Sequence, residues 1–260
     1  MTGVQTCALP IFHRTTIEPL LQQKVEALLK RELGALDAEA SLAAVVVNNR
    51  SHGVTVYVGN ADFAAVARRG TLDMARAIRS PGSALKPFIY AMAFDQLIIH
   101  PETVLEDRPR HFGDYAPVDF DGRFQGDVTA REALQYSLNV PAVSVLDRLG
   151  PGRFTATLAA AGARLHLPQP AAEPGLAVAL GGVGISLVDL VRLYTALPNG
   201  GEVAPLRYRL DDPAAPGMRT FGATAAWYVS DILGEAPSPP GVVPPEVHRG
   251  RRLAVKTGTS

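Results

Sequence analysis

The sequence is poor in the residues that several common functional sites require. Its one cysteine, Cys7, excludes both a disulfide framework and a cysteine-ligated metal site. The six histidines are scattered and no two have the spacing of metal ligands, so we predict no metal and no other cofactor. Lysine plus arginine balances aspartate plus glutamate at 25 each. Because the net charge is zero, we also predict no nucleic-acid partner.

A phosphate-binding loop is also missing. The glycine-rich stretch 179–186 lacks the G-x-G-x-x-G spacing, and no Lys-Ser/Thr pair follows it. We interpret it as a tight turn that packs near the core ahead of a helix.

What is present suits a folded protein with a substantial core. The chain has 260 residues, of which 47% are hydrophobic and 19% are charged, which fits one large or two modest globular domains. The 24 glycines and 21 prolines predict many turns and long connections.

Both ends of the chain are unusual. Residues 1–11 resemble the translation of a widely used sequencing-library adapter, so we expect a non-native leader and exclude it from the fold. Under that expectation Met1 is not a true start, and the lack of a signal peptide does not locate the parent protein. The chain also stops inside an expected strand at 253–257. We therefore predict that residues 12–260 are part of a domain.

The first elements are a helix and a hairpin. Thr15 and Glu18 have the spacing of a capping box, and apolar residues then recur at helical intervals until Gly34, an expected C-terminal cap. Residues 42–47 and 54–58 are two β-rich runs separated by a turn, which is typical of a hairpin.

The middle of the chain is expected to be helical. A helix beginning at about Ser83 is apolar on nearly every side and should be buried. Phe88 and Phe94 in this helix, and Trp227 much later in the chain, are expected to be core residues. Residues 100–127 suggest a long ordered loop. Further helices are predicted at 129–137, 141–149, 152–161 and 187–197. Early strands, a helical middle and a late strand together predict an α+β fold, with an antiparallel sheet packed against a helical lobe.

Three short motifs follow one another along the chain. S-x-x-K occupies 83–86 at a helix start, S-x-N occupies 137–139 just past a helix, and K-T-G-T occupies 256–259 on the expected strand. S-x-x-K and S-x-N are common by chance, whereas K-T-G-T is rare. The chain has only four lysines, and two of them lie in these motifs. We interpret the ordered triple as one catalytic site.

Ser83 and Lys86 have the spacing of a nucleophile and its base. A serine hydroxyl reacts poorly until a base removes its proton, and Lys86 lies one helical turn away on the same face. To act as that base, Lys86 needs a pKa well below the usual ~10.4. Burial and a nearby cation, for which Lys256 is the candidate, can lower it. Backbone N–H groups at the helix start can hold the oxyanion.

The other two motifs suggest proton transfer and substrate binding. Ser137 can pass a proton towards a leaving amine, and Asn139 can hydrogen-bond a substrate amide. Gly258 permits close backbone approach. Three neighbouring side chains could together bind a carboxylate: Lys256, Thr257 and Thr259.

These motifs resemble the transpeptidase domain of class A penicillin-binding proteins. The same resemblance extends to four further stretches of this chain, at 112–115, 131–134, 137–143 and 180–182. The resemblance is strongest over 79–260 and covers nearly all of the chain beyond the leader. It implies a penicillin-binding protein/serine β-lactamase-like fold. It also implies that Ser83 attacks the penultimate D-alanine carbonyl of a peptidoglycan stem peptide, releases the terminal D-alanine and passes the acyl group to the amine of a neighbouring stem.

Further expectations come with the resemblance. β-Lactam antibiotics mimic D-alanyl-D-alanine and would acylate Ser83, and the backbone N–H groups of Ser83 and Thr259 would form the oxyanion hole. The parent protein would carry a glycosyltransferase domain upstream. It would lie in the periplasm, on the outer face of the bacterial inner membrane, tethered by an N-terminal span that this chain lacks.

Three related functions stay open. A β-lactamase shares the serine, the lysine and the K-T-G strand. However, this chain carries Leu138 where class A β-lactamases usually carry aspartate, and no E-x-x-L-N glutamate supplies a deacylating base. A D,D-carboxypeptidase uses the same first step with water as acceptor. A β-lactam sensor stops at acylation.

The resemblance also implies an incomplete sheet. In this family the strands between the hairpin and the K-T-G strand come from sequence that follows K-T-G. We therefore predict that the central strands are missing and that the hairpin at 42–58 does not pair with 253–257. We expect a gap between them, or a forced closure, with exposed apolar strand faces, and the fragment would be unstable or inactive. A continuous five-stranded sheet would contradict this prediction.

Overall fold

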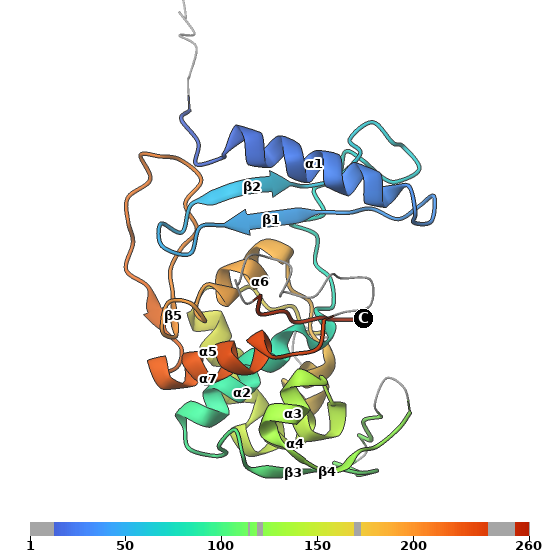
Figure 1. Ribbon diagram of the computed structural model, residues 1–260, viewed down its shortest axis with the longest axis vertical. Coiled ribbons are helices and arrows are strands. Elements are labelled where there is room, and N and C mark those ends of the chain that lie inside the picture. Colours follow the sequence, from blue (N-terminus) through green and yellow to red (C-terminus); the bar gives the residue numbers. More distant parts are fainter. Residues whose placement is uncertain (1–12, 114, 119–121, 169–172, 239–252, 260) are drawn as a thin grey trace, which may run out of the picture.

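The computed structural model describes residues 13–113, 115–118, 122–168, 173–238 and 253–259 (Figure 1). The expected leader at 1–11, with its Cys7, lies outside the described residues.

The chain begins with a helix whose start differs from the predicted one. Helix α1 (Pro19–Leu33) has Glu18 as its N-cap, with no side-chain capping bond, and Gly34 as its C-cap. The predicted capping box at Thr15 is wrong, because Thr15 instead forms a β-bridge with Arg209. Proline is favoured in the first helical turn, where its missing N–H is not needed, so Pro19 sets the start.

The predicted hairpin is confirmed. Strands β1 (Ala44–Val47) and β2 (Val54–Val58) pair antiparallel, with a register irregularity between Val46 and Val47. Three valines of β2 are buried because α1 packs on this strand, which Figure 1 shows beneath the helix. The hairpin and α1 thus form a small unit at one end of the molecule.

The predicted helical middle is also confirmed, and α2 lies at its centre. A short 3-10 helix, η1 (Gly82–Leu85), leads into α2 (Lys86–Asp95), in which every residue from Lys86 to Phe94 is buried. Buried apolar residues from the surrounding helices pack into one core with it. These helices are α3 (Ala130–Gln135), α4 (Asn139–Leu149), α5 (Pro151–Ala160), η2 (Leu176–Leu180), α6 (Leu187–Tyr194) and α7 (Ala223–Gly234).

Helix α7 was not predicted, and with it the placement of Trp227 is wrong. Phe88 and Phe94 are buried as predicted, whereas 61% of Trp227 is exposed. The reason is that α7 turns a face of alanines, Val229, Ile232 and Leu233 towards the core. Trp227 lies on the other side of the helix.

The region expected to be a long loop contains two strands. Strands β3 (Val104–Asp107) and β4 (Gly126–Thr129) pair antiparallel and bring the two ends of that region together. A third pair, β5 (Glu202–Val203) and β6 (Met218–Arg219), lies between α6 and α7 in the chain. Gly181 adopts a left-handed φ of 92° after η2, which confirms a tight turn ahead of α6.

Residues 253–259 do not form the predicted strand. Their backbone meets the end of α7, where the Val255 N–H donates to the Leu233 carbonyl at 3.4 Å. Among the described residues the sheets have two strands each, so the predicted lack of pairing with the hairpin is confirmed. A cleft of about 470 Å³ separates them, lined by Val47, Tyr194 and Ala254 among others. In the described part of the chain, no helix is long and apolar enough to cross a membrane.

Candidate active site

Ser83 lies on the η1 turn, three residues before α2 begins at Lys86. The Ala84 N–H donates to the Pro81 carbonyl at 3.0 Å, which closes the turn, and Ser83 itself is half-buried. Gly82 adopts a φ of 52°, a left-handed conformation that glycine takes without a Cβ penalty. The turn therefore presents Ser83 at the start of α2, in which every residue from Lys86 to Phe94 is buried.

Lys86 joins the first motif to the second. It is fully buried at the first position of α2, and its Nζ lies close to three oxygen atoms. These are the Ser137 carbonyl at 2.5 Å, the Asn139 Oδ1 at 2.6 Å and the Leu138 carbonyl at 3.0 Å. A lysine ammonium has three hydrogens to donate, so these acceptors fix the head group.

Ser137 has a backbone conformation that sequence reasoning did not predict. Helix α3 begins with a capping box between Thr129 and Glu132 and ends before Ser137, whose φ is 59°. Non-glycine residues seldom adopt this left-handed region, and they cluster at functional sites. Here Ser137 meets Lys86 through its carbonyl and meets Lys256 through its hydroxyl, as the Lys256 Nζ lies 2.8 Å from Oγ.

Lys256 lies in an environment that changes its acidity. Its Nζ also donates to the Thr257 carbonyl at 2.7 Å. Desolvation by burial lowers its pKa from the usual 10.5 to about 8. Lys256 therefore remains mostly protonated at neutral pH, but it loses its proton at a lower pH than a lysine in water does.

The K-T-G-T segment packs directly on the Ser83 turn. A Cβ added to Gly82 would lie 2.7 Å from the Thr259 backbone nitrogen, and one added to Gly258 would lie 3.2 Å from the Ala84 nitrogen. Real Cβ atoms essentially never come within 3.0 Å of backbone atoms, so a side chain at Gly82 would push the segment away. The side chains of Thr257 and Thr259 are exposed.

Asn139 connects the site to the segment 115–118. Its Nδ2 donates to the Val118 carbonyl at 2.6 Å while its Oδ1 accepts from Lys86. Tyr115, in the same segment, is half-buried, and burial raises its pKa. Asp114, which precedes Tyr115 in the sequence, lies outside the described residues.

The structure thus brings the three motifs together. Ser83 and Lys86 come from the η1–α2 junction, Ser137 and Asn139 from the α3–α4 junction, and residues 256–259 from the end of the chain. Sequence reasoning missed the Leu138 and Val118 carbonyls, which carry no signal because any residue has a carbonyl. In the part of the chain that the structure describes, no cluster of histidine, cysteine, aspartate and glutamate could hold a metal ion.

A family comparison agrees with this geometry. Residues 42–260 match the model of the penicillin binding protein transpeptidase domain. Because the match covers most of the chain, the chain belongs to that family, and the resemblance noted from its motifs is confirmed.

Curated relatives agree as well. Penicillin-binding protein 1C of Escherichia coli K12 is 42% identical over 248 residues, which are 95% of this chain and 31% of that protein. Penicillin-binding protein 1F of Bacillus subtilis 168 is 30% identical over 237 residues, 86% of this chain and 32% of that protein. The chain therefore spans about a third of the length of these relatives.

The fold also has solved counterparts. The structure of PonA1 from Mycobacterium tuberculosis in complex with penicillin V aligns with a TM-score of 0.72 and 20% identity. The alignment covers 85% of this chain and 62% of the PonA1 chain. The expected penicillin-binding transpeptidase fold is therefore confirmed.

Proposed function

We propose that this chain carries the acylation site of a serine D,D-transpeptidase that cross-links peptidoglycan, with Ser83 as nucleophile. The observation that carries the proposal is the convergence on the Ser137 hydroxyl. Lys256 lies 2.8 Å from it and Lys86 lies 3.5 Å from it, so three segments far apart in the sequence meet at one oxygen. Two lysines around a hydroxyl provide a route for protons and an environment for a negatively charged substrate.

In the first step the Ser83 Oγ attacks the carbonyl carbon of the penultimate D-alanine, and Lys86, as the neutral amine, takes the hydroxyl proton. The carbonyl π electrons move to oxygen, where the N–H groups of Ser83 and Thr259 would stabilise the charge. The C–N bond then breaks, and the Ser137 hydroxyl delivers a proton to the departing D-alanine amine. The proton taken by Lys86 restores that hydroxyl, so the acyl-enzyme forms with no net change in protons.

In the second step an amine of a neighbouring stem peptide attacks the ester carbonyl. The amine proton returns through the same groups to the Ser83 oxygen, and a new amide bond joins the two stems. Lys256 and the threonines of 257–259 are proposed to bind the terminal carboxylate of the donor stem. Asn139 is proposed to bind its amide once the Val118 carbonyl has been displaced.

A β-lactam would be attacked in the same way. Its ring C–N bond takes the place of the D-alanyl amide bond, and the opened ring stays attached to Ser83. As for the parent protein, we propose a bifunctional enzyme with an upstream glycosyltransferase domain. We place it on the periplasmic side of the inner membrane, as the resemblance to class A penicillin-binding proteins implies.

The test is intact mass after incubation with benzylpenicillin, using the full chain and its Ser83→Ala variant, with circular dichroism on both. A stable adduct of one equivalent on the chain, and none on a folded variant, is the expected result. A folded wild-type chain that forms no adduct would contradict the proposal. An adduct that disappears within minutes would instead favour the β-lactamase alternative.

A further inference from the structure

The η1 turn that carries Ser83 is preceded by residues that form hydrogen bonds with the segment leading into α6. Arg79 and Ile185 exchange backbone hydrogen bonds, with the Arg79 N–H donating at 3.1 Å and the Ile185 N–H at 2.9 Å. The Ser80 Oγ donates to the Gly181 carbonyl at 2.8 Å. The residues just before the nucleophile are therefore fixed to the residues just before α6.

The far end of α6 makes a second contact with the turn. Tyr194 is the last residue of this helix, and its hydroxyl donates to the Ala84 carbonyl at 2.8 Å. Its ring meets Phe88 of α2 edge to face, with the centroids 5.1 Å apart. Burial raises the pKa of the Tyr194 hydroxyl, so it stays protonated and keeps donating throughout the range in which enzymes work.

Ala84 lies between this tyrosine and the K-T-G-T segment. Gly258 approaches the Ala84 nitrogen and Cβ from one side, and Tyr194 holds the Ala84 carbonyl from the other. The Ala84 carbonyl belongs to the peptide that links Ala84 to Leu85, and this peptide lies within the same η1 turn as Ser83. Loss of the bond from Tyr194 would therefore loosen the turn that carries Ser83.

We propose that Tyr194 is a positioning residue for the acylation step. Its hydroxyl fixes the Ala84 peptide and thereby keeps Ser83 in the orientation for attack. This inference rests on the proposed function. It adds a residue outside the three motifs, and the hydroxyl acts through Ala84 without touching the substrate.

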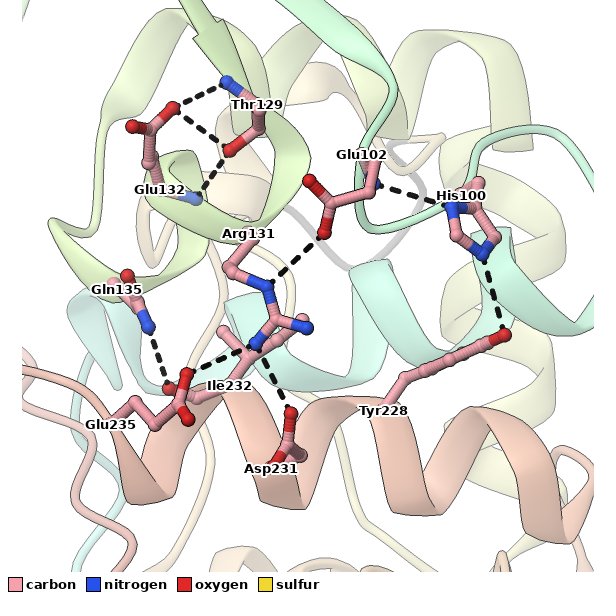
Figure 2. Close-up of polar contacts among 10 residues, drawn as sticks. All are labelled: His100, Glu102, Thr129, Arg131, Glu132, Gln135, Tyr228, Asp231, Ile232 and Glu235. Carbon is pink, nitrogen blue, oxygen red and sulfur yellow. Dashed lines mark hydrogen bonds and ion pairs between the residues drawn. The ribbon is translucent and has the colours of Figure 1, made fainter.

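The test compares Tyr194→Phe with a matched control, Tyr228→Phe. Both changes remove one hydroxyl and leave the ring. The Tyr228 hydroxyl contacts His100 at 3.3 Å (Figure 2), and its ring packs on Phe94 near the last residue of α2, at the opposite end of that helix from Lys86. The acylation rate constant at saturation and the dissociation constant of the non-covalent complex are measured separately with a fluorescent penicillin, after circular dichroism shows that each variant is folded.

For Tyr194→Phe we expect the acylation rate constant to fall about tenfold, the effect of losing one well-aligned hydrogen bond, with an unchanged dissociation constant. Tyr228→Phe should change neither. A Tyr194→Phe variant that acylates at the wild-type rate, or that changes only the dissociation constant, would overturn the proposal.

A second measurement works even if no penicillin binds. Amide hydrogen exchange over residues 80–88 should be faster in Tyr194→Phe than in the wild-type chain and Tyr228→Phe. If the wild-type chain is not acylated, the proposed function fails, and this comparison still decides the role of Tyr194. Equal exchange in all three proteins would overturn it.

Discussion

The two walls of the candidate site are built in different ways. One wall consists of Ser83, Lys86, Ser137 and Asn139, which lie at the starts and ends of helices packed in the core. The other is the extended segment 253–259, which has exposed threonines and no strand partner among the described residues. In Figure 1 this segment passes between α6 and α7.

The difference lies in what holds each wall in place. Lys86 is fixed by three oxygen acceptors and complete burial. Lys256 is fixed by one hydroxyl, its neighbour's carbonyl and the close approach of Gly258 to the Ser83 turn. The helical wall is therefore part of the protein core, whereas the second wall depends on contacts with the first.

The largest effect is expected from Lys86→Met. This change removes the proposed base and leaves buried carbonyls without a donor. Acylation should fall by roughly 10²- to 10⁴-fold, and the chain should lose about 1–3 kcal/mol of stability. Penicillin acylation kinetics and urea unfolding measure the two effects. The Lys256→Met variant should lose less acylation and less stability. An equal or greater loss would contradict the conclusion that the helical wall is the more firmly fixed of the two.

Gly82→Ala should separate the segment 253–259 from the turn that carries Ser83. The alanine Cβ would collide with the Thr259 backbone, and the left-handed φ adds about 1–2 kcal/mol of strain. We expect at least a tenfold loss of acylation, roughly the effect of a misplaced binding group. Gly113→Ala is the matched control, because Gly113 also has a positive φ of 60° but nothing near its Cβ position. If both variants lose acylation equally, strain alone explains the effect.

The acidity of Lys256 predicts how acylation depends on pH. Penicillin carries a carboxylate, which the protonated lysine attracts, so acylation should decline as pH rises through about 8. Measuring acylation rates across this range tests the prediction. Lys256→Met should lack the decline, and a decline that persists in this variant would assign it to another group.

The same shift affects stability with a definite sign. The pKa of Lys256 is lower in the folded chain, about 8, than its usual 10.5 in an unfolded one. The unfolded chain therefore binds more protons between these values, and the contribution of this lysine to stability rises as pH increases through that window. Below pH 8 the full penalty for its buried charge applies. Urea unfolding at several pH values should show this slope in the wild-type chain and not in Lys256→Met.

The smallest effect concerns the helices behind the site. Arg131 of α3 forms ion pairs with Asp231 and Glu235 of α7 and with Glu102 (Figure 2). Arg131→Met should lower stability by about 1 kcal/mol, since such pairs are partly exposed. Arg164→Met, in a pair with 79% of the arginine exposed, should have no measurable effect. Thermal unfolding compares them, and equal melting temperatures would show that the α3–α7 pairs contribute nothing.

The sequence predicted the helical wall better than the segment opposite it. Helical periodicity and the S-x-x-K spacing identify α2 and its lysine because both depend on residues close together in the chain. The left-handed Ser137 and the Val118 contact depend on distant segments, and no local pattern records them. The expected strand at 253–257 is wrong for a related reason, since a strand requires a partner and the described residues supply none.

Two further differences arise from the same cause. Thr15 and Glu18 have the spacing of a capping box, but pairing with Arg209 draws Thr15 into an extended conformation. Trp227 was expected in the core because tryptophan is large and apolar, yet α7 buries its small residues instead. In both cases tertiary packing overrides a local preference.

The most direct test of the account is to locate the penicilloyl group by peptide mass spectrometry of the acylated full chain. Ser137 is a real rival as nucleophile, because its hydroxyl lies within reach of both lysines. We predict a single adduct on Ser83, with none on Ser137 or Ser80. An adduct on Ser137 that persists in Ser83→Ala would contradict it.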